Sequence, residues 1–115
     1  MTEPEQSPQP FDRAQDAPAE GMIAVSVRYY NMLRRRTGIE QETIALPAGT
    51  LLHSALERLA QRHGPVLREM LFAPEGSVSS HLVVFRNRRL VHPDRYHVTL
   101  ADDDELMLFP AIAGG

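Results

Sequence analysis

The chain has 115 residues, a formal net charge of −3 and no cysteine. This length suits one domain with a short appendage, and the near-balanced charge does not indicate a protein that binds nucleic acid or a membrane. The lack of cysteine excludes a disulfide framework, a thiolate nucleophile and a cysteine-ligated metal. No signal-peptide core or long apolar run is present, so we expect a cytoplasmic protein.

The first 21 residues form a separate compositional segment. They are rich in proline and acidic side chains, and Phe11 is their only large apolar anchor. Such a stretch cannot bury enough surface to offset the entropy lost on ordering. Residues 1–21 are therefore predicted to be a disordered, acidic, proline-rich tail. Residues 22–115 are long enough to form one folded domain with a single core.

Two strands are predicted at the start of the domain. Residues 22–30 alternate between apolar and polar side chains, which is the pattern of a half-buried strand. Its apolar face consists of Ile23, Val25, Val27 and Tyr29. Residues 34–38, Arg-Arg-Arg-Thr-Gly, predict a basic turn, and residues 42–46 predict a second short strand before Pro47. Together these segments indicate an N-terminal hairpin.

One amphipathic helix follows. Thr50 is its expected N-cap, and Gly64 followed by Pro65 is a typical stop signal. Apolar residues recur at helical spacing along one side. They are Leu52, Ala55, Leu56, Leu59 and Ala60. Residues 66–72 are predicted to add a further helical turn, and residues 73–80 to form a loop.

The C-terminal half predicts three more strands and their turns. The strands are expected at residues 82–85, 89–91 and 105–109, with turns at 87–88, 93–96 and 102–104. Asn87 suits the left-handed backbone of a tight hairpin, whereas Arg88 suits it poorly. The element order predicts an α+β roll in which one main helix packs on one face of a mixed sheet. Ubiquitin-like β-grasp domains have this order.

The last residues are predicted to form an exposed C-terminal tail, residues 110–115. Pro110 cannot donate to a sheet ladder, so we expect it to release the chain from the sheet. The five residues that follow span about 16 Å when extended. They are Ala111, Ile112, Ala113, Gly114 and Gly115. The two terminal glycines leave the tip without bulk, so a narrow enzyme tunnel could accept it, and the Gly115 carboxylate is predicted to be the working group.

A partner-binding face is predicted from strand parity. Phe85, Met107 and Phe109 are expected on the sheet face opposite the helix. They form either a minor core under a loop or, with Tyr30, a patch for a partner protein. Arg34 is a further candidate for pairing with acidic groups of a partner.

No metal site or catalytic side chain is predicted. The acidic run 102–104 cannot direct all its carboxylates at one ion and is interpreted as a solvated turn. The five histidines lack ligand spacing such as a helical i, i+4 pair. We expect no bound cofactor.

Two stretches resemble the MoaD/ThiS-type sulfur carrier family, and in particular the small subunit of molybdopterin synthase. Residues 28–38, Arg-Tyr-Tyr-Asn-Met-Leu-Arg-Arg-Arg-Thr-Gly, are similar to the family opening Arg-Tyr-Phe-Ala-x-Leu-Arg-Glu followed by glycine. Residues 100–115 resemble the family ending, Asp-Gly-Asp-Glu, a hydrophobic strand and Phe-Pro-Pro-Val-x-Gly-Gly. The chain departs from these patterns at Asn31, Arg35, Asp103 and Ala111.

The resemblance implies a sulfur-transfer cycle. A ubiquitin-activating-type enzyme adenylates the Gly115 carboxylate with ATP, and a persulfide or sulfide displaces AMP to leave a thiocarboxylate. In the molybdopterin branch the large synthase subunit is the partner in a hetero-oligomer. Tethered delivery positions the sulfur and raises its effective concentration.

Other functions remain open at this stage. Carriers for cysteine biosynthesis end in a similar proline-alanine-aliphatic-alanine-Gly-Gly tail, and thiamine-type carriers share the Gly-Gly end. A ubiquitin-like protein modifier, or an interaction module without acyl chemistry, would have the same fold. All 12 residues counted as lysine or arginine are arginine, so no lysine of this chain can accept an isopeptide bond.

Overall fold

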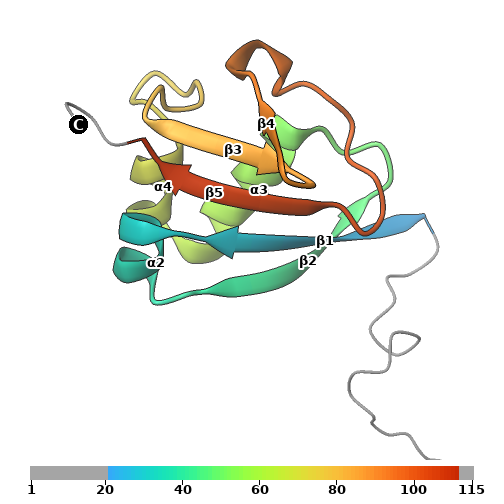
Figure 1. Ribbon diagram of the computed structural model, residues 1–115, viewed down its shortest axis with the longest axis horizontal. Coiled ribbons are helices and arrows are strands. Elements are labelled where there is room, and N and C mark those ends of the chain that lie inside the picture. The colour runs from blue at the N-terminus through green and yellow to red at the C-terminus, as the bar shows by residue number, and fades with distance from the viewer. Residues whose placement is uncertain (1–20, 112–115) are drawn as a thin grey trace, which may run out of the picture.

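A computed structural model describes residues 21–111, which form one mixed sheet covered by helices on one face (Figure 1). The strands are β1 (Met22–Tyr29), β2 (Gln41–Pro47), β3 (Leu82–Arg86), β4 (Arg89–Val91) and β5 (Glu105–Pro110). The helices are α2 (Asn31–Thr37), α3 (Leu52–His63), α4 (Pro65–Leu71) and the 3₁₀ helix η1 (Pro93–Arg95). The predicted α+β roll, with one main helix on a mixed sheet, is confirmed. The predicted tail of residues 1–21 lies outside the described residues, apart from Gly21.

The strand order β2-β1-β5-β3-β4 places the last strand of the chain at the centre of the sheet. β5 runs parallel to β1 and antiparallel to β3, while β1–β2 and β3–β4 are antiparallel hairpin pairs. The parallel β1–β5 pairing requires a crossover, and α3 and α4 belong to it on the far side of the sheet in Figure 1. Within residues 21–111, no helix has the length and apolar character needed to cross a membrane.

The core lies between the sheet and its helices, and the predicted strand parity is confirmed. The four apolar side chains expected on the inner face of β1 are all buried. So is the predicted stripe of α3, which consists of Leu52, Ala55, Leu56, Leu59 and Ala60. From β3 and β5, Leu82, Val84, Leu106 and Leu108 belong to the same core. Alternate residues of each strand are buried against the i, i+3, i+4 stripe of the helix, as the two-residue period of a strand and the 3.6-residue period of a helix require.

The N-terminus of α3 differs from its prediction. Its N-cap is Leu51, and the Thr50 hydroxyl instead donates to the Pro47 carbonyl at 2.6 Å. The first helical N–H groups of Leu52 and His53 donate to the carbonyls of Val98 and Tyr96, at 2.9 and 2.8 Å. A side-chain cap is therefore not needed, because the loop after η1 satisfies these otherwise unpaired donors.

Residues 34–38 belong mostly to a helix rather than to a basic turn. α2 begins directly after Tyr30, buries Leu33, and ends at Gly38, whose φ of 75° is left-handed. The Gly38 N–H closes the last turn on the Arg34 carbonyl at 2.8 Å. The three arginines lie in the last turn, where their charge complements the partial negative charge of the helix end. The predicted basic turn is therefore wrong for residues 34–37, which continue the helix, and only Gly38 turns the chain.

The predicted tight hairpin at residues 87–88 is confirmed. Asn87 and Arg88 both have positive φ angles, 53° and 71°, as a two-residue hairpin loop requires. This turn sets the register in which Phe85 faces Leu90 and Arg86 faces Arg89.

Candidate functional site

The site is built on β5 and on the point where the chain leaves it. Along its first four residues β5 pairs with β1, and the Leu108 carbonyl accepts the Tyr30 N–H at 3.1 Å. On its other side β5 pairs with β3 from Leu106 to its end, where Pro110 lies opposite Leu82. A strand held on both sides at the centre of a sheet is a rigid base for whatever follows it.

The chain does not leave the sheet at Pro110, contrary to prediction. Pro110 is the last residue of β5, and the Ala111 N–H still donates to the His81 carbonyl at 2.5 Å. In an antiparallel pair, every second residue of a strand forms backbone hydrogen bonds with the same neighbouring strand. Phe109 and Ala111 are the positions that face β3 in this way, and Pro110 lies between them. The missing Pro110 donor thus points towards β1, whose pairing with β5 has already ended at Leu108. The described chain therefore stays hydrogen-bonded to the sheet as far as Ala111.

A cluster of three aromatic side chains and one methionine lies on the outer sheet face beside this exit point. The Tyr30 and Phe109 rings stack with centroids 4.2 Å apart and an interplanar angle of 4°. Phe85 meets Phe109 edge-on at 5.6 Å and lies across from Met107 in the ladder. All four side chains are partly exposed. This outer-face cluster, Tyr30, Phe85, Met107 and Phe109, confirms the prediction that these residues share the face opposite the helices.

No described segment covers the outer-face cluster, because the helices lie behind the sheet (Figure 1). A minor core under a loop is therefore excluded for residues 21–111. Flat aromatic surface with partial exposure is typical of the centre of a protein–protein interface. Phe109 is two residues before Ala111, so a partner on this cluster would also reach the end of the chain.

Arg34 lies on the exposed side of α2, at the same end of the sheet as the exit point (Figure 1). Its guanidinium is 3.9 Å from the Glu40 carboxylate, and both side chains are more than half exposed. Such a pair contributes little to stability in water. Arg34 can therefore exchange Glu40 for an acidic group of a partner at small cost.

The start of β5 is fixed by Asp104, which the sequence predicted to be part of a solvated turn. Its side chain is 6% exposed and accepts hydrogen bonds from Arg86 Nε at 2.9 Å, Asn87 Nδ2 at 2.8 Å and the Ala101 N–H at 2.7 Å. The same loop is joined to β1, since Asp102 Oδ1 accepts the Ala24 N–H at 2.8 Å. Asp102 and Asp103 are exposed, as predicted, whereas Asp104 is buried and anchors the turn.

Burial by itself would raise the pKa of the Asp104 carboxyl. The hydrogen bonds from Ala101, Asn87 and Arg86, with the charge of Arg86, outweigh burial and hold that pKa below its ordinary value. Asp104 is therefore ionised at neutral pH. Within residues 21–111, no group of three or more histidine, aspartate or glutamate side chains is arranged to hold a metal ion.

The predicted working group lies beyond these residues. Ile112, Ala113, Gly114 and Gly115 are outside the described part of the chain. The structure brings two of the predicted partner-binding residues, Tyr30 and Phe109, together near the end of β5. The sequence did not predict the hydrogen bond from the Ala111 N–H to β3 or the burial of Asp104, because neither feature has a signal in local composition.

Comparison with known proteins gives a family and a set of similar structures. The profile of the ThiS family matches residues 27–115. No curated protein matches the chain. Three similar solved structures each share 25% sequence identity with it and are covered over 99% of their own length.

The first of these is SAMP1 from Haloferax volcanii, with a TM-score of 0.71 over 80% of this chain. The second is a putative molybdopterin converting factor, subunit 1, from Pyrococcus furiosus, with a TM-score of 0.61 over 78%. The third is the BexX/CysO complex of Amycolatopsis orientalis, with a TM-score of 0.58 over 79%. These likenesses confirm the predicted ubiquitin-like β-grasp fold.

Proposed function

We propose that this chain, which belongs to the ThiS family of ubiquitin-like sulfur carriers and modifiers, carries sulfur as a thiocarboxylate on Gly115. The observation behind this is the position of β5. The last described hydrogen bond of the chain fixes Ala111, and Gly115 is four residues further on. Four residues span at most about 14 Å, so the carboxylate stays within that distance of a rigid base.

The chemistry follows from the weakness of a carboxylate as an acyl electrophile. An activating enzyme would transfer AMP from ATP to the Gly115 carboxylate with release of pyrophosphate. Hydrosulfide then attacks the acyl carbon, the bond to the AMP oxygen breaks, and AMP leaves. With a persulfide donor, the first product is an acyl disulfide, and a thiol must reduce its S–S bond to release the thiocarboxylate. ATP belongs to the activating enzyme, and no cofactor bound to this chain is needed.

The acceptor we propose is a pterin precursor on the large subunit of molybdopterin synthase, in a hetero-oligomer with this chain. Two features support that branch: the Phe109–Pro110 step and the likeness to the Pyrococcus furiosus converting factor. A carrier for cysteine or thiamine biosynthesis is the second candidate, favoured by the likeness to the BexX/CysO structure and by Ala111 after Pro110. A protein modifier is the third, by the likeness to SAMP1.

The intact mass of the protein, with fragmentation at its C-terminus, tests this proposal. After incubation with ATP, sulfide and a ubiquitin-activating-type enzyme, we expect a species in which sulfur replaces one oxygen of Gly115. Free carboxylate alone under all these conditions would overturn the proposal. Stable binding of the pterin-converting large subunit would identify the acceptor branch, whereas Gly115 joined to a lysine of another protein would identify a modifier.

The outer-face cluster is expected to be the docking surface for the enzymes of this cycle. Replacing Phe109 with alanine removes both of its ring contacts and should weaken binding of the activating enzyme or large subunit about tenfold, as at an interface hot spot. Affinity measured by calorimetry checks this, with Val66→Ala as the control, since Val66 is an exposed apolar residue on α4, away from the cluster. Equal loss of affinity in the two variants would show that the cluster is not the contact surface.

A further inference from the structure

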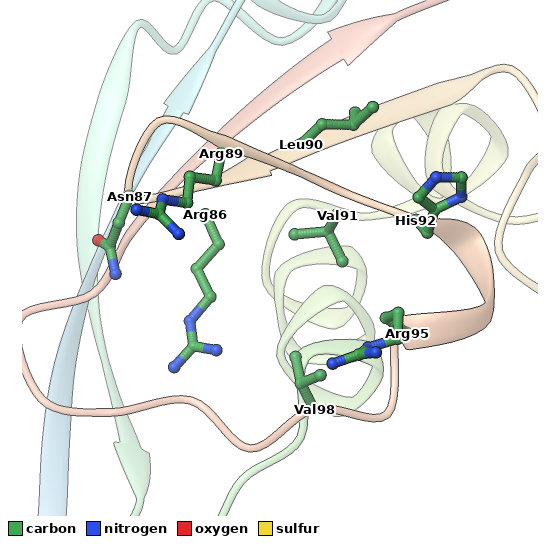
Figure 2. Close-up of a pocket in the computed structure, with 8 residues that line it drawn as sticks. All are labelled: Arg86, Asn87, Arg89, Leu90, Val91, His92, Arg95 and Val98. Carbon is green, nitrogen blue, oxygen red and sulfur yellow. The ribbon is translucent and has the colours of Figure 1, made fainter.

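A second site is indicated at the β4 edge of the sheet. An open cavity of about 550 Å³ lies between β4, η1 and the segment that runs on to Val98 (Figure 2). This volume is in the range of small-molecule binding sites. β4 is an edge strand two positions from β5, and Arg86 lies at the end of β3 away from the Leu82–Pro110 pair. The cavity is therefore separate from the end of β5 at Pro110.

Two arginines of the hairpin place like charges next to each other. Arg86 and Arg89 lie directly opposite each other in the β3–β4 ladder. Both project from the same face, and like charges in this position repel and destabilise the ladder. Arg86 is balanced by Asp104 at 2.9 Å. Among residues 21–111, no carboxylate forms an ion pair with Arg89, so the excess positive charge at this position is not neutralised within the described chain.

A third guanidinium comes from the other side of the cavity. Figure 2 shows Arg95, on η1, pointing across the opening towards the side of Arg86 and Arg89. Arg95 has a fixed backbone, because its N–H donates to the His92 carbonyl at 2.8 Å and its carbonyl accepts the Val98 N–H at 3.1 Å. It also lacks an acidic ion-pair partner within the described residues. Positively charged arginine side chains therefore lie on both sides of the cavity opening.

The floor between the arginines is apolar. Val91 and Val98 are partly buried, belong to the lining of the cavity, and lie between the hairpin and η1 in Figure 2. Guanidinium groups form paired hydrogen bonds with phosphate oxygens, and an apolar floor accepts the uncharged part of a ligand. The overall charge of −3 argues against an extended polyanion such as nucleic acid, because the positive charge is local.

We propose that this cavity binds a small phosphate-bearing molecule with an apolar group, about the size of a mononucleotide. Its phosphate would lie between Arg89 and Arg95 and offset the repulsion between Arg86 and Arg89. The apolar group would cover Val91 and Val98. Arg86 remains paired with Asp104, so it contributes positive charge to the cavity but not an unpaired guanidinium group.

The test uses the full chain with inorganic phosphate, pyrophosphate and AMP as probes. We expect saturable binding by calorimetry, with AMP tighter than inorganic phosphate, and amide shifts confined to residues 86–98 in NMR spectra. Arg89→Gln and Arg95→Gln should each weaken AMP binding about tenfold, the effect of losing a charged hydrogen-bond donor. Arg36→Gln, an exposed arginine on α2, is the matched control and should leave binding unchanged.

Four results would overturn the proposal. They are the absence of saturable binding at millimolar ligand, equal weakening by Arg36→Gln, AMP no tighter than inorganic phosphate, and displacement of AMP by an acidic peptide that binds more tightly. The last would assign the cavity to a segment of a partner protein. Circular dichroism of each variant establishes that it is folded before binding is compared.

Discussion

Deletion of Gly115 is expected to abolish sulfur loading while leaving the fold intact. The shortened chain still ends in a glycine carboxylate, so its chemistry is unchanged and only its reach is altered, by about 3.3 Å. In a positioned reaction, misplacement by about 1 Å can lower the rate about 100-fold. We therefore expect a loss of at least that size in thiocarboxylate formation, measured by intact mass against time with ATP, sulfide and the activating enzyme.

Two comparisons make this result specific to the terminus. The thermal unfolding midpoint should be nearly unchanged, because the buried core of the described residues lies between Ile23 and Leu108. Gly115→Ala retains the length of the chain and adds one methyl group, so it separates reach from bulk at the tip. A shortened protein that loads at the normal rate would show that the carboxylate is not held at a fixed distance from β5. A large loss of stability would show that the terminus is packed.

The features that the sequence predicted correctly are those with a repeating pattern. Alternation along β1 identified the buried face because successive side chains of a strand point to opposite sides. The same parity placed Phe85, Met107 and Phe109 together on the outer face. Likewise, α3 is long enough for its apolar stripe to repeat, and Gly64 followed by Pro65 marks its end.

The features that the sequence did not predict depend on contacts distant in the chain. α2 has only seven residues and one buried side chain, so no period could be recognised in it. Pro110 continues β5 because β1 has already ended beside it, which is a property of the sheet. Thr50 is not needed as a cap because Val98 and Tyr96, far along the chain, supply carbonyls to Leu52 and His53. Asp104 resembles its acidic neighbours in sequence and differs from them in burial and in its hydrogen bonds to Arg86, Asn87 and Ala101.

Replacing Asp104 with alanine is the substitution from which we expect the largest loss of stability. The change removes three hydrogen bonds at the start of β5, leaves the Ala101 N–H and Asn87 amide without their acceptor, and leaves Arg86 beside Arg89 without a counter-charge. Hydrogen bonds to a buried charge contribute about 1.5–3 kcal/mol, and breaking a buried ion pair costs about 3–5 kcal/mol. Because Arg86 is partly exposed and can gain water, we expect a loss near the low end, about 3 kcal/mol, in urea unfolding.

Graded variants and pH test whether the charge of Asp104 causes this loss. Asp104→Asn keeps the size and one acceptor and should cost less than Asp104→Ala, whereas Glu69→Ala, at an exposed position on α4, should change stability little. Since folding lowers the Asp104 pKa, its contribution is fully present above the ordinary value of 3.8 and is lost as pH falls through the lower folded value. The difference in unfolding free energy between the wild type and Asp104→Asn should therefore shrink in acid. A difference that stays constant down to low pH would mean that packing, and not the ionised carboxylate, anchors the start of β5. The anchor matters for function because β5 sets the position of Ala111, from which the terminal carboxylate is presented.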